Sequence, residues 1–166
     1  MRRTRKERGL ARGQEKDQLL VKLLKADAPY EEIKRALLAL EKRWLHEAKT
    51  EVERQRIRRG IAEDLVSQAY SFDMPWEEFG QWLRRVQRLG FSNLALRVHL
   101  SCLYVQSLHL FPRRAREAWD LLEDAERRVL RVRKEHFLRK ESLHAIAHAK
   151  KVATVGRPTS SSPVRV

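Results

Sequence analysis

The sequence contains a single cysteine, Cys102, and this scarcity excludes two kinds of structural support. A lone thiol can form neither an internal disulfide nor a zinc site built from cysteines alone. The neighbouring residues in 98–104 are mostly apolar, so we expect Cys102 to be a buried structural thiol. One unpaired cysteine also favours an intracellular protein that is not secreted.

Long apolar runs are missing as well. No run approaches the roughly 18 residues of a transmembrane helix. No apolar signal region directly follows the N-terminal arginines. The alternation of apolar and polar residues that is typical of strands is also missing. Apolar residues recur instead every three or four positions, as in helices. These patterns predict an all-α protein without a transmembrane segment.

The residue patterns of common catalytic sites are absent. The chain has neither a Gly-x-x-x-x-Gly-Lys loop nor a Gly-x-Gly-x-x-Gly loop. His144 and His148 are four residues apart, but Ala145 stands where a zinc protease has glutamate, and no third ligand is apparent. We therefore expect no enzyme, no catalytic residue, no cofactor and no metal site.

Positive charge is abundant. The 166 residues include 36 Lys and Arg against 22 Asp and Glu, which gives a formal net charge of +14. Such an excess attracts polyanions, and the usual partners are nucleic acid, an anionic membrane surface or an acidic protein. Nucleic acid is the partner that we expect first.

The composition along the chain predicts three segments. Residues 1–13 are expected to form a flexible basic arm, because they are rich in arginine and contain Gly9 and Gly13. Residues 155–166 are rich in Pro, Ser and Thr and are expected to form a disordered tail. Residues 14–154 between them are expected to form a single helical domain, either a multi-helix bundle or a short helical-repeat array with a long basic C-terminal helix or helical hairpin.

Apolar stripes predict the helices. A first helix is expected over about 14–26, and a second follows Asp27 with a stripe that runs from Ile33 to Val52. The stripe loses phase near residue 55 and resumes at Ile57, and we place a break or bend at Gly60. Residues 94–108 are apolar on nearly every face, which is typical of a central buried helix. Residues 113–153 carry an apolar seam, either on one long helix or on a hairpin bent near 134–135.

One helix start occurs twice. Residues 27–32 (Asp-Ala-Pro-Tyr-Glu-Glu) and residues 73–78 (Asp-Met-Pro-Trp-Glu-Glu) share Asp, Pro, an aromatic residue and two Glu, 46 residues apart. This offset lies in the range of helical repeats. Common capping chemistry also explains the likeness, because Asp, Pro and Glu are all favoured at helix starts.

Basic clusters are the strongest functional signal. A helical face that carries several arginines can meet several phosphates at once. The expected nucleic-acid-binding residues are Arg2, Arg3, Arg5, Lys6 and Arg8 of the arm; Arg54, Arg56, Arg58 and Arg59; and Arg127, Arg128, Arg131, Arg133 and Lys134. The last cluster has no acidic residue within it, and Arg127, Arg131 and Lys134 would share one face of a continuous helix.

Two other nucleic-acid motifs fit less well. Gly90 and Ser92 resemble the turn of a helix-turn-helix, but the helix that follows is too apolar to be a recognition helix. Trp76, Phe79 and Trp82 recur at helical spacing, which is more typical of a core than of a base-stacking surface.

The sequence therefore predicts a non-enzymatic helical protein that binds nucleic acid, mainly through its phosphates. The alternative is a helical-repeat or coiled-coil adaptor that binds or inhibits an acidic protein. The C-terminal seam could also pair with another copy of the chain.

Overall fold

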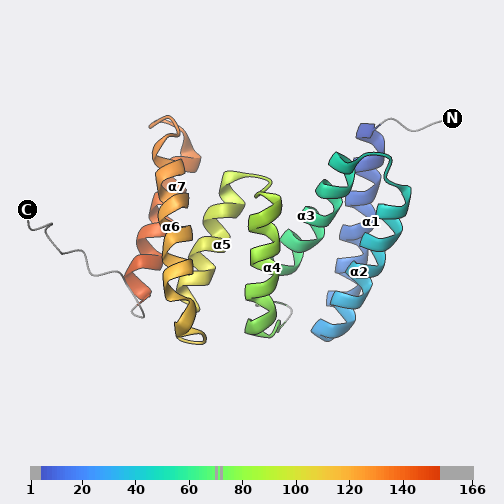
Figure 1. Cartoon of the computed structure of the whole chain (residues 1–166), viewed down its shortest axis with the longest axis horizontal. Coiled ribbons are helices and arrows are strands. Elements are labelled where there is room, and N and C mark those ends of the chain that lie inside the picture. The colour runs from blue at the N-terminus through green and yellow to red at the C-terminus, as the bar shows by residue number, and fades with distance from the viewer. Residues whose placement is uncertain (1–4, 70, 72, 154–166) are drawn as a thin grey trace, which may run out of the picture. The chain divides into compact units, whose positions relative to one another are not determined.

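The computed structural model describes residues 5–69, 71 and 73–153, and its regular secondary structure there is helical, with no strand (Figure 1). The helices fall into two compact units, Met1–Leu89 and Gly90–Val166. The region 14–154, expected to form a single helical domain, is thus divided between the two units, and the boundary falls at a short Gly90 turn that carries no linker-like composition. The expected tail, 155–166, lies outside the described residues.

The first unit contains α1 (Arg5–Lys25), α2 (Tyr30–Glu47), α3 (Glu51–Ser67) and α4 (Trp76–Leu89). Helix α3 packs against both α2 and α4, and α1 packs against α2 (Figure 1). No described helix of either unit has both the length and the apolar run that a membrane span needs.

The flexible arm expected over residues 1–13 is wrong for residues 5–13, which belong to α1. Gly9 and Gly13 weaken the helix locally, but Arg8 and Arg12, one turn apart, both reach Glu53 of α3. These tertiary ion pairs hold the N-terminal half of α1 against the unit. Residues 1–4 lie outside the described residues.

The break expected at Gly60 is also wrong, because α3 runs through that residue without interruption. The helical conformation is interrupted earlier, between the end of α2 at Glu47 and the start of α3 at Glu51, and Thr50 is the N-cap of α3. Its side chain accepts a hydrogen bond from the backbone N–H of Glu53 at 3.2 Å, and the Glu53 carboxylate accepts from the N–H of Lys49 at 3.1 Å. A Thr-x-x-Glu sequence is a recognised helix-start signal, so this break was readable from residues 50–53.

The two similar helix starts have the same backbone geometry. Asp27 and Asp73 both have positive φ, 50° and 48°. The residue after each Asp closes a turn onto the carbonyl five positions back, Ala28 onto Leu23 and Met74 onto Ala69, both at 3.0 Å. Each Asp is therefore the left-handed residue of a Schellman-type turn, and not the N-cap of the helix that follows.

The core of the first unit follows the predicted stripes. Ile33, Leu37 and Leu40 of α2 are buried, as are Phe79, Leu83 and Val86, the residues aligned with them in α4. Val52, expected to continue the first stripe, is 53 % exposed because the chain has already turned at Thr50. Burial of these stripes against α3 is what holds α2, α3 and α4 together.

The second unit contains α5 (Leu94–Gln106), a short 3-10 turn (Pro112–Arg114), α6 (Ala115–Leu130) and α7 (Phe137–Val152). Helix α5 packs against both α6 and α7, so the prediction of a central buried helix is confirmed. Asn93 caps α5 by accepting a hydrogen bond from the N–H of Leu96 at 2.8 Å. The region 113–153 is a hairpin of two helices, and one long C-terminal helix is not observed.

The apolar seam of the C-terminal region faces its own unit. Ala118, Leu122, Ala125 and Val129 of α6 are fully buried, and Ile146 of α7 is 1 % exposed. Helix α6 packs against α5 and α7, so these residues find their partners within the chain.

Candidate nucleic-acid interface

The basic residues expected in the arm are only partly available. Arg2 and Arg3 lie outside the described residues, and Arg5 and Lys6 belong to α1 but their side chains are not described. Arg8 lies 3.9 Å from the Glu53 carboxylate. That carboxylate partly neutralises the charge of Arg8 within the first unit, so the arm is a weaker phosphate site than its sequence suggested.

The α3 cluster is partly compensated by one acidic residue. Arg54 and Arg58 lie 3.8 Å and 3.1 Å from the Glu51 carboxylate. Arg56 is exposed and Arg59 is half-buried, and neither has an ion pair with a described residue. Arg54 and Arg58 share one side of α3 and Arg56 lines a different pocket, so the four arginines do not form one phosphate-binding row.

Arg54 and Arg58 line a shallow groove of about 760 Å³ beside the C-terminal end of α2. The α2 wall of this groove adds Lys42, Arg43 and His46, residues that the sequence analysis did not select. Arg43 is engaged by Glu15 of α1. The groove is basic overall, and its signal in the sequence was the spacing of Lys42 and His46 on one face of α2.

The strongest concentration of exposed charge lies where α6 ends and α7 begins. We call residues 127–137 the α6–α7 corner. Its five cations are all exposed: Arg127, Arg128, Arg131, Arg133 and Lys134. Arg128 pairs with Asp124 one turn earlier, at 2.9 Å, and the other four have no ion pair with a described residue.

The expected single helical face at 127–134 is wrong. Helix α6 ends at Leu130, and Arg133 and Lys134 lie in the connection to α7. The cause is a contact from outside the cluster, because the Arg139 guanidinium of α7 donates to the carbonyls of Leu130 and Val132 at 3.1 and 2.8 Å. These bonds satisfy carbonyls that a continuing helix would otherwise use.

The start of α7 is fixed by a second local contact. His136 is its N-cap, and the His136 Nδ1 atom accepts a hydrogen bond from the N–H of Leu138 at 3.2 Å. The His136 N–H in turn donates to the carbonyl of Arg133 at 3.1 Å. The loop therefore has a defined conformation that presents its cations outward.

An exposed aromatic ring lies within the same corner. Phe137 is 74 % exposed, and its ring stacks on that of His136 with centroids 5.1 Å apart and planes 22° apart. Leu130, also in the corner, is 50 % exposed. The sequence analysis missed Phe137. The available signal was an aromatic residue directly after a basic run and outside the apolar seam.

The structure also places the cysteine and the two histidines of the second unit that the sequence analysis considered. Cys102 is buried, as predicted, and desolvation raises the pKa of its thiol to about 11. His144 and His148 are exposed, and no three His, Cys, Asp or Glu side chains of the described chain converge to hold a metal.

The arrangement can therefore bind an anion and a flat apolar surface together, at a corner whose backbone is fixed by hydrogen bonds. Comparison of the chain with protein families, with curated proteins and with solved structures found no match.

Proposed function

We propose that this chain binds nucleic acid through the α6–α7 corner and catalyses no reaction on it. The observation that carries the proposal is the exposed ring of Phe137 beside five exposed cations. Guanidinium groups bind phosphate through paired hydrogen bonds, and an aromatic ring stacks on a base of any identity. The corner offers both kinds of contact within eleven consecutive residues, 127–137.

The exposed ring favours a nucleic acid with unpaired bases. A base inside a duplex stacks on its neighbours and offers no free face, whereas a base in a single strand or loop does. Phosphate contacts carry no sequence information by themselves, so we expect little sequence preference. The groove lined by Lys42, Arg54 and Arg58 would add a second phosphate contact in the other unit.

Fluorescence anisotropy with a labelled single strand of about 12 nucleotides tests the electrostatic part of the proposal. Each phosphate contact contributes about 0.7 to the slope of log affinity against log salt, so the triple variant R131Q/R133Q/K134Q should flatten the slope by about 2. The triple variant K22Q/K25Q/R35Q removes the same charge from exposed positions of α1 and α2 and should change the slope much less. Equal slopes for the two variants would place binding elsewhere.

The stacking part is tested by Phe137→Ala. Loss of one stacked base costs about 1–3 kcal/mol of binding free energy, so affinity should fall by about 5- to 150-fold. Val21→Ala, at a 50 % exposed residue of α1, is the matched control and should leave affinity unchanged. Binding to a duplex of the same length should be weaker and should not depend on Phe137.

An anionic membrane is the main competing partner, because Leu130 and Phe137 could enter a lipid interface beside basic residues. Co-sedimentation with vesicles that contain phosphatidylserine distinguishes the two. Binding to vesicles that is lost in Phe137→Ala, together with no binding to the single strand, would refute the nucleic-acid proposal.

A second candidate function is a helical adaptor for an acidic protein. The shared turn geometry at Asp27 and Asp73 favours it, because identical corners are typical of repeat proteins that present extended binding surfaces. A pull-down treated with nuclease separates the two functions. Partners that survive digestion support the adaptor, and partners lost with the nucleic acid support the first proposal.

A further inference from the structure

A cavity of about 220 Å³ lies in the first unit, between α1 and α3, with Trp44 of α2 in its lining. Its apolar wall also includes Ile57 and Ile61 of α3. These three residues are buried, and Ile61 is only 1 % exposed. The cavity is therefore partly open to solvent, and its apolar wall adjoins the core.

Three glycines keep this space open. Gly9 and Gly13 of α1 and Gly60 of α3 line the cavity, and a Cβ atom at any of them would meet no other atom within 4 Å. None of the three has the positive φ that requires glycine. A glycine in a helix costs about 1 kcal/mol relative to alanine, so neither packing nor backbone geometry accounts for these residues. Their effect is to leave room beside the apolar wall.

The charged part of the lining contains one available cation. Two of its basic residues are occupied by carboxylates: the Arg12 guanidinium binds Glu53 at 2.7 Å, and the Lys16 ammonium lies 2.5 Å from Asp64. Arg56 is exposed and has no ion pair with a described residue. Among the described residues, the lining thus combines an apolar wall, the paired groups Arg12, Lys16 and Glu53, and one unpaired guanidinium.

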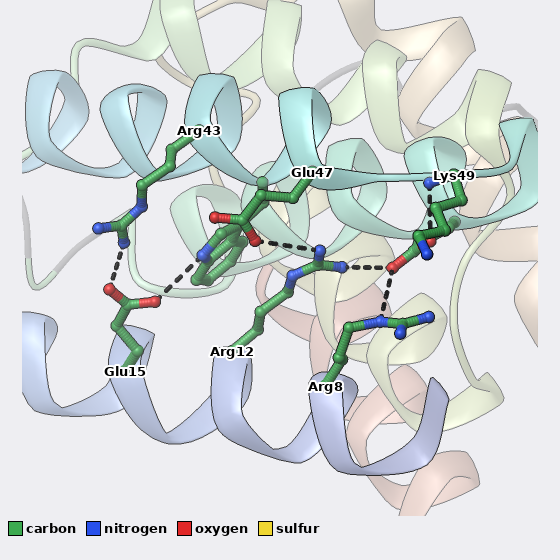
Figure 2. A network of polar contacts seen from close by, with 8 residues as sticks. Arg8, Arg12, Glu15, Arg43, Glu47 and Lys49 are labelled. Carbon is green, nitrogen blue, oxygen red and sulfur yellow. Dashed lines mark hydrogen bonds and ion pairs between the residues drawn. The ribbon is translucent and has the colours of Figure 1, made fainter. Parts of the chain in front are cut away.

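The wall formed by α1 is held by polar contacts. Figure 2 shows Arg8, Arg12 and Glu15 reaching from α1 toward Arg43, Glu47 and Lys49. Glu15 also accepts a hydrogen bond from the indole N–H of Trp44 at 3.1 Å. These contacts lie along α1 on both sides of Gly13, and they hold this wall of the cavity in place.

We propose that this cavity binds a small, flat apolar monocarboxylate, with its ring against Trp44 and Ile57 and its carboxylate on Arg56. The volume is below the usual 300–1,000 Å³ of pockets for drug-sized ligands, so one or two rings are the largest body that fits. An apolar wall with one convergent cation is the usual composition of a site for such a ligand. The site is distinct from the α6–α7 corner and lies in the other unit.

Nuclear magnetic resonance of the ¹⁵N-labelled full chain, with 2-naphthoate as the probe, tests the proposal. The amide signals of Gly13 and Gly60 and the indole signal of Trp44 should shift together and saturate. Acetate, which lacks the ring, should not shift them, and neutral 2-naphthamide should bind at least about tenfold more weakly, because it lacks the charge that Arg56 binds.

Three variants make the test specific. Gly60→Leu should abolish the shifts by filling the space, and Arg56→Gln should weaken 2-naphthoate by about tenfold without changing the affinity for 2-naphthamide. Gly80→Ala is the matched control, since Gly80 lies in the interior of α4 outside the cavity, and it should bind like the parent chain. If Gly60→Leu does not fold, Arg56→Gln and the comparison with 2-naphthamide carry the test. Naphthoate binding that is unaffected by these substitutions, or equal shifts with acetate, would overturn the proposal.

Discussion

The attachment of α1 should depend on one carboxylate. Glu53 of α3 accepts a hydrogen bond from Arg12 at 2.7 Å and lies 3.9 Å from Arg8, and its side chain is only 12 % exposed. Apolar packing contributes little, because Leu23 is the one buried apolar residue among the described side chains of α1, and Leu10 is 60 % exposed. Substitution Glu53→Gln should therefore weaken the attachment of α1 while the rest of the first unit keeps its stability.

The magnitude follows from the contacts that are lost. A hydrogen bond to a charged group contributes about 1.5–3 kcal/mol, so Glu53→Gln should lower the free energy of α1 opening by about 2 kcal/mol. Hydrogen exchange of the α1 amides should then become about 30-fold faster. Amides of α4 should keep their protection, because α4 packs on α3 and the Glu53 carboxylate is contacted by Arg8, Arg12 and Lys49. Mass spectrometry of peptic peptides from α1 and α4 measures both.

Glu51→Gln is the matched control. Glu51 lies on the same helix but its side chain is 57 % exposed, and its ion pairs with described residues are to Arg54 and Arg58 of α3 itself. It should leave the exchange of α1 unchanged. Unchanged exchange in Glu53→Gln, or equal acceleration in α1 and α4, would refute the conclusion that this carboxylate holds α1.

The same carboxylate makes the attachment sensitive to pH. Desolvation raises the pKa of Glu53, but hydrogen bonds from the Lys49 N–H and from Arg12 outweigh it, so the pKa lies below its ordinary value. A carboxyl group with a lowered pKa stabilises the fold fully above its unfolded pKa, and this contribution is lost as the pH falls through the folded value. Protection factors of the α1 amides should therefore fall below about pH 4.5 in the parent chain and stay level in Glu53→Gln.

Three further substitutions or reactions test the second unit. Leu122→Ala should cost about 2–5 kcal/mol, because the side chain is fully buried, and exchange should accelerate in α5–α7 alone; equal acceleration in α3 would contradict the division into two units. Asn93→Ala should lower stability in thermal unfolding by about 1 kcal/mol, whereas Asn93→Ser keeps a cap acceptor and should change it by only a few tenths. Cys102, with its raised pKa of about 11, should react with iodoacetamide at neutral pH much more slowly in the folded chain than in urea; equal rates would show that the thiol is accessible.

Helices were predictable from local periodicity, because burial of one face requires it. The all-round apolar character of α5 placed that helix close to its observed bounds, and the stripe of α2 indicated its start, but the stripe ran past the observed end of α2 at Glu47. The capping sequence of residues 50–53 also indicated the break at Thr50 from local sequence. The break was instead predicted at the interior glycine Gly60. A single glycine costs too little to end a helix that is buried on one side.

Other features depend on residues distant in sequence and were not predictable locally. The helical state of residues 5–13 depends on Glu53, about forty positions away. The end of α6 depends on Arg139, which reaches back to the Leu130 carbonyl. The same reason applies to the candidate site. The basic residues of 127–134 could be selected from the sequence, but the exposure of Phe137 could not be predicted without knowing that α6 ends before it.

The Arg139 contacts have a consequence for the energetics of binding. Its guanidinium is occupied by two carbonyls of the connection between α6 and α7, so it orders that connection before any ligand arrives. Fixing the backbone of a flexible loop costs about 1–2 kcal/mol per residue at the moment of association. Residues 131–136 lose little further conformational entropy on binding, because their backbone is already ordered in the folded chain. Arg139, which need not touch a ligand, thereby makes the corner a preorganised template, and more of the contact energy of its neighbours is available as affinity.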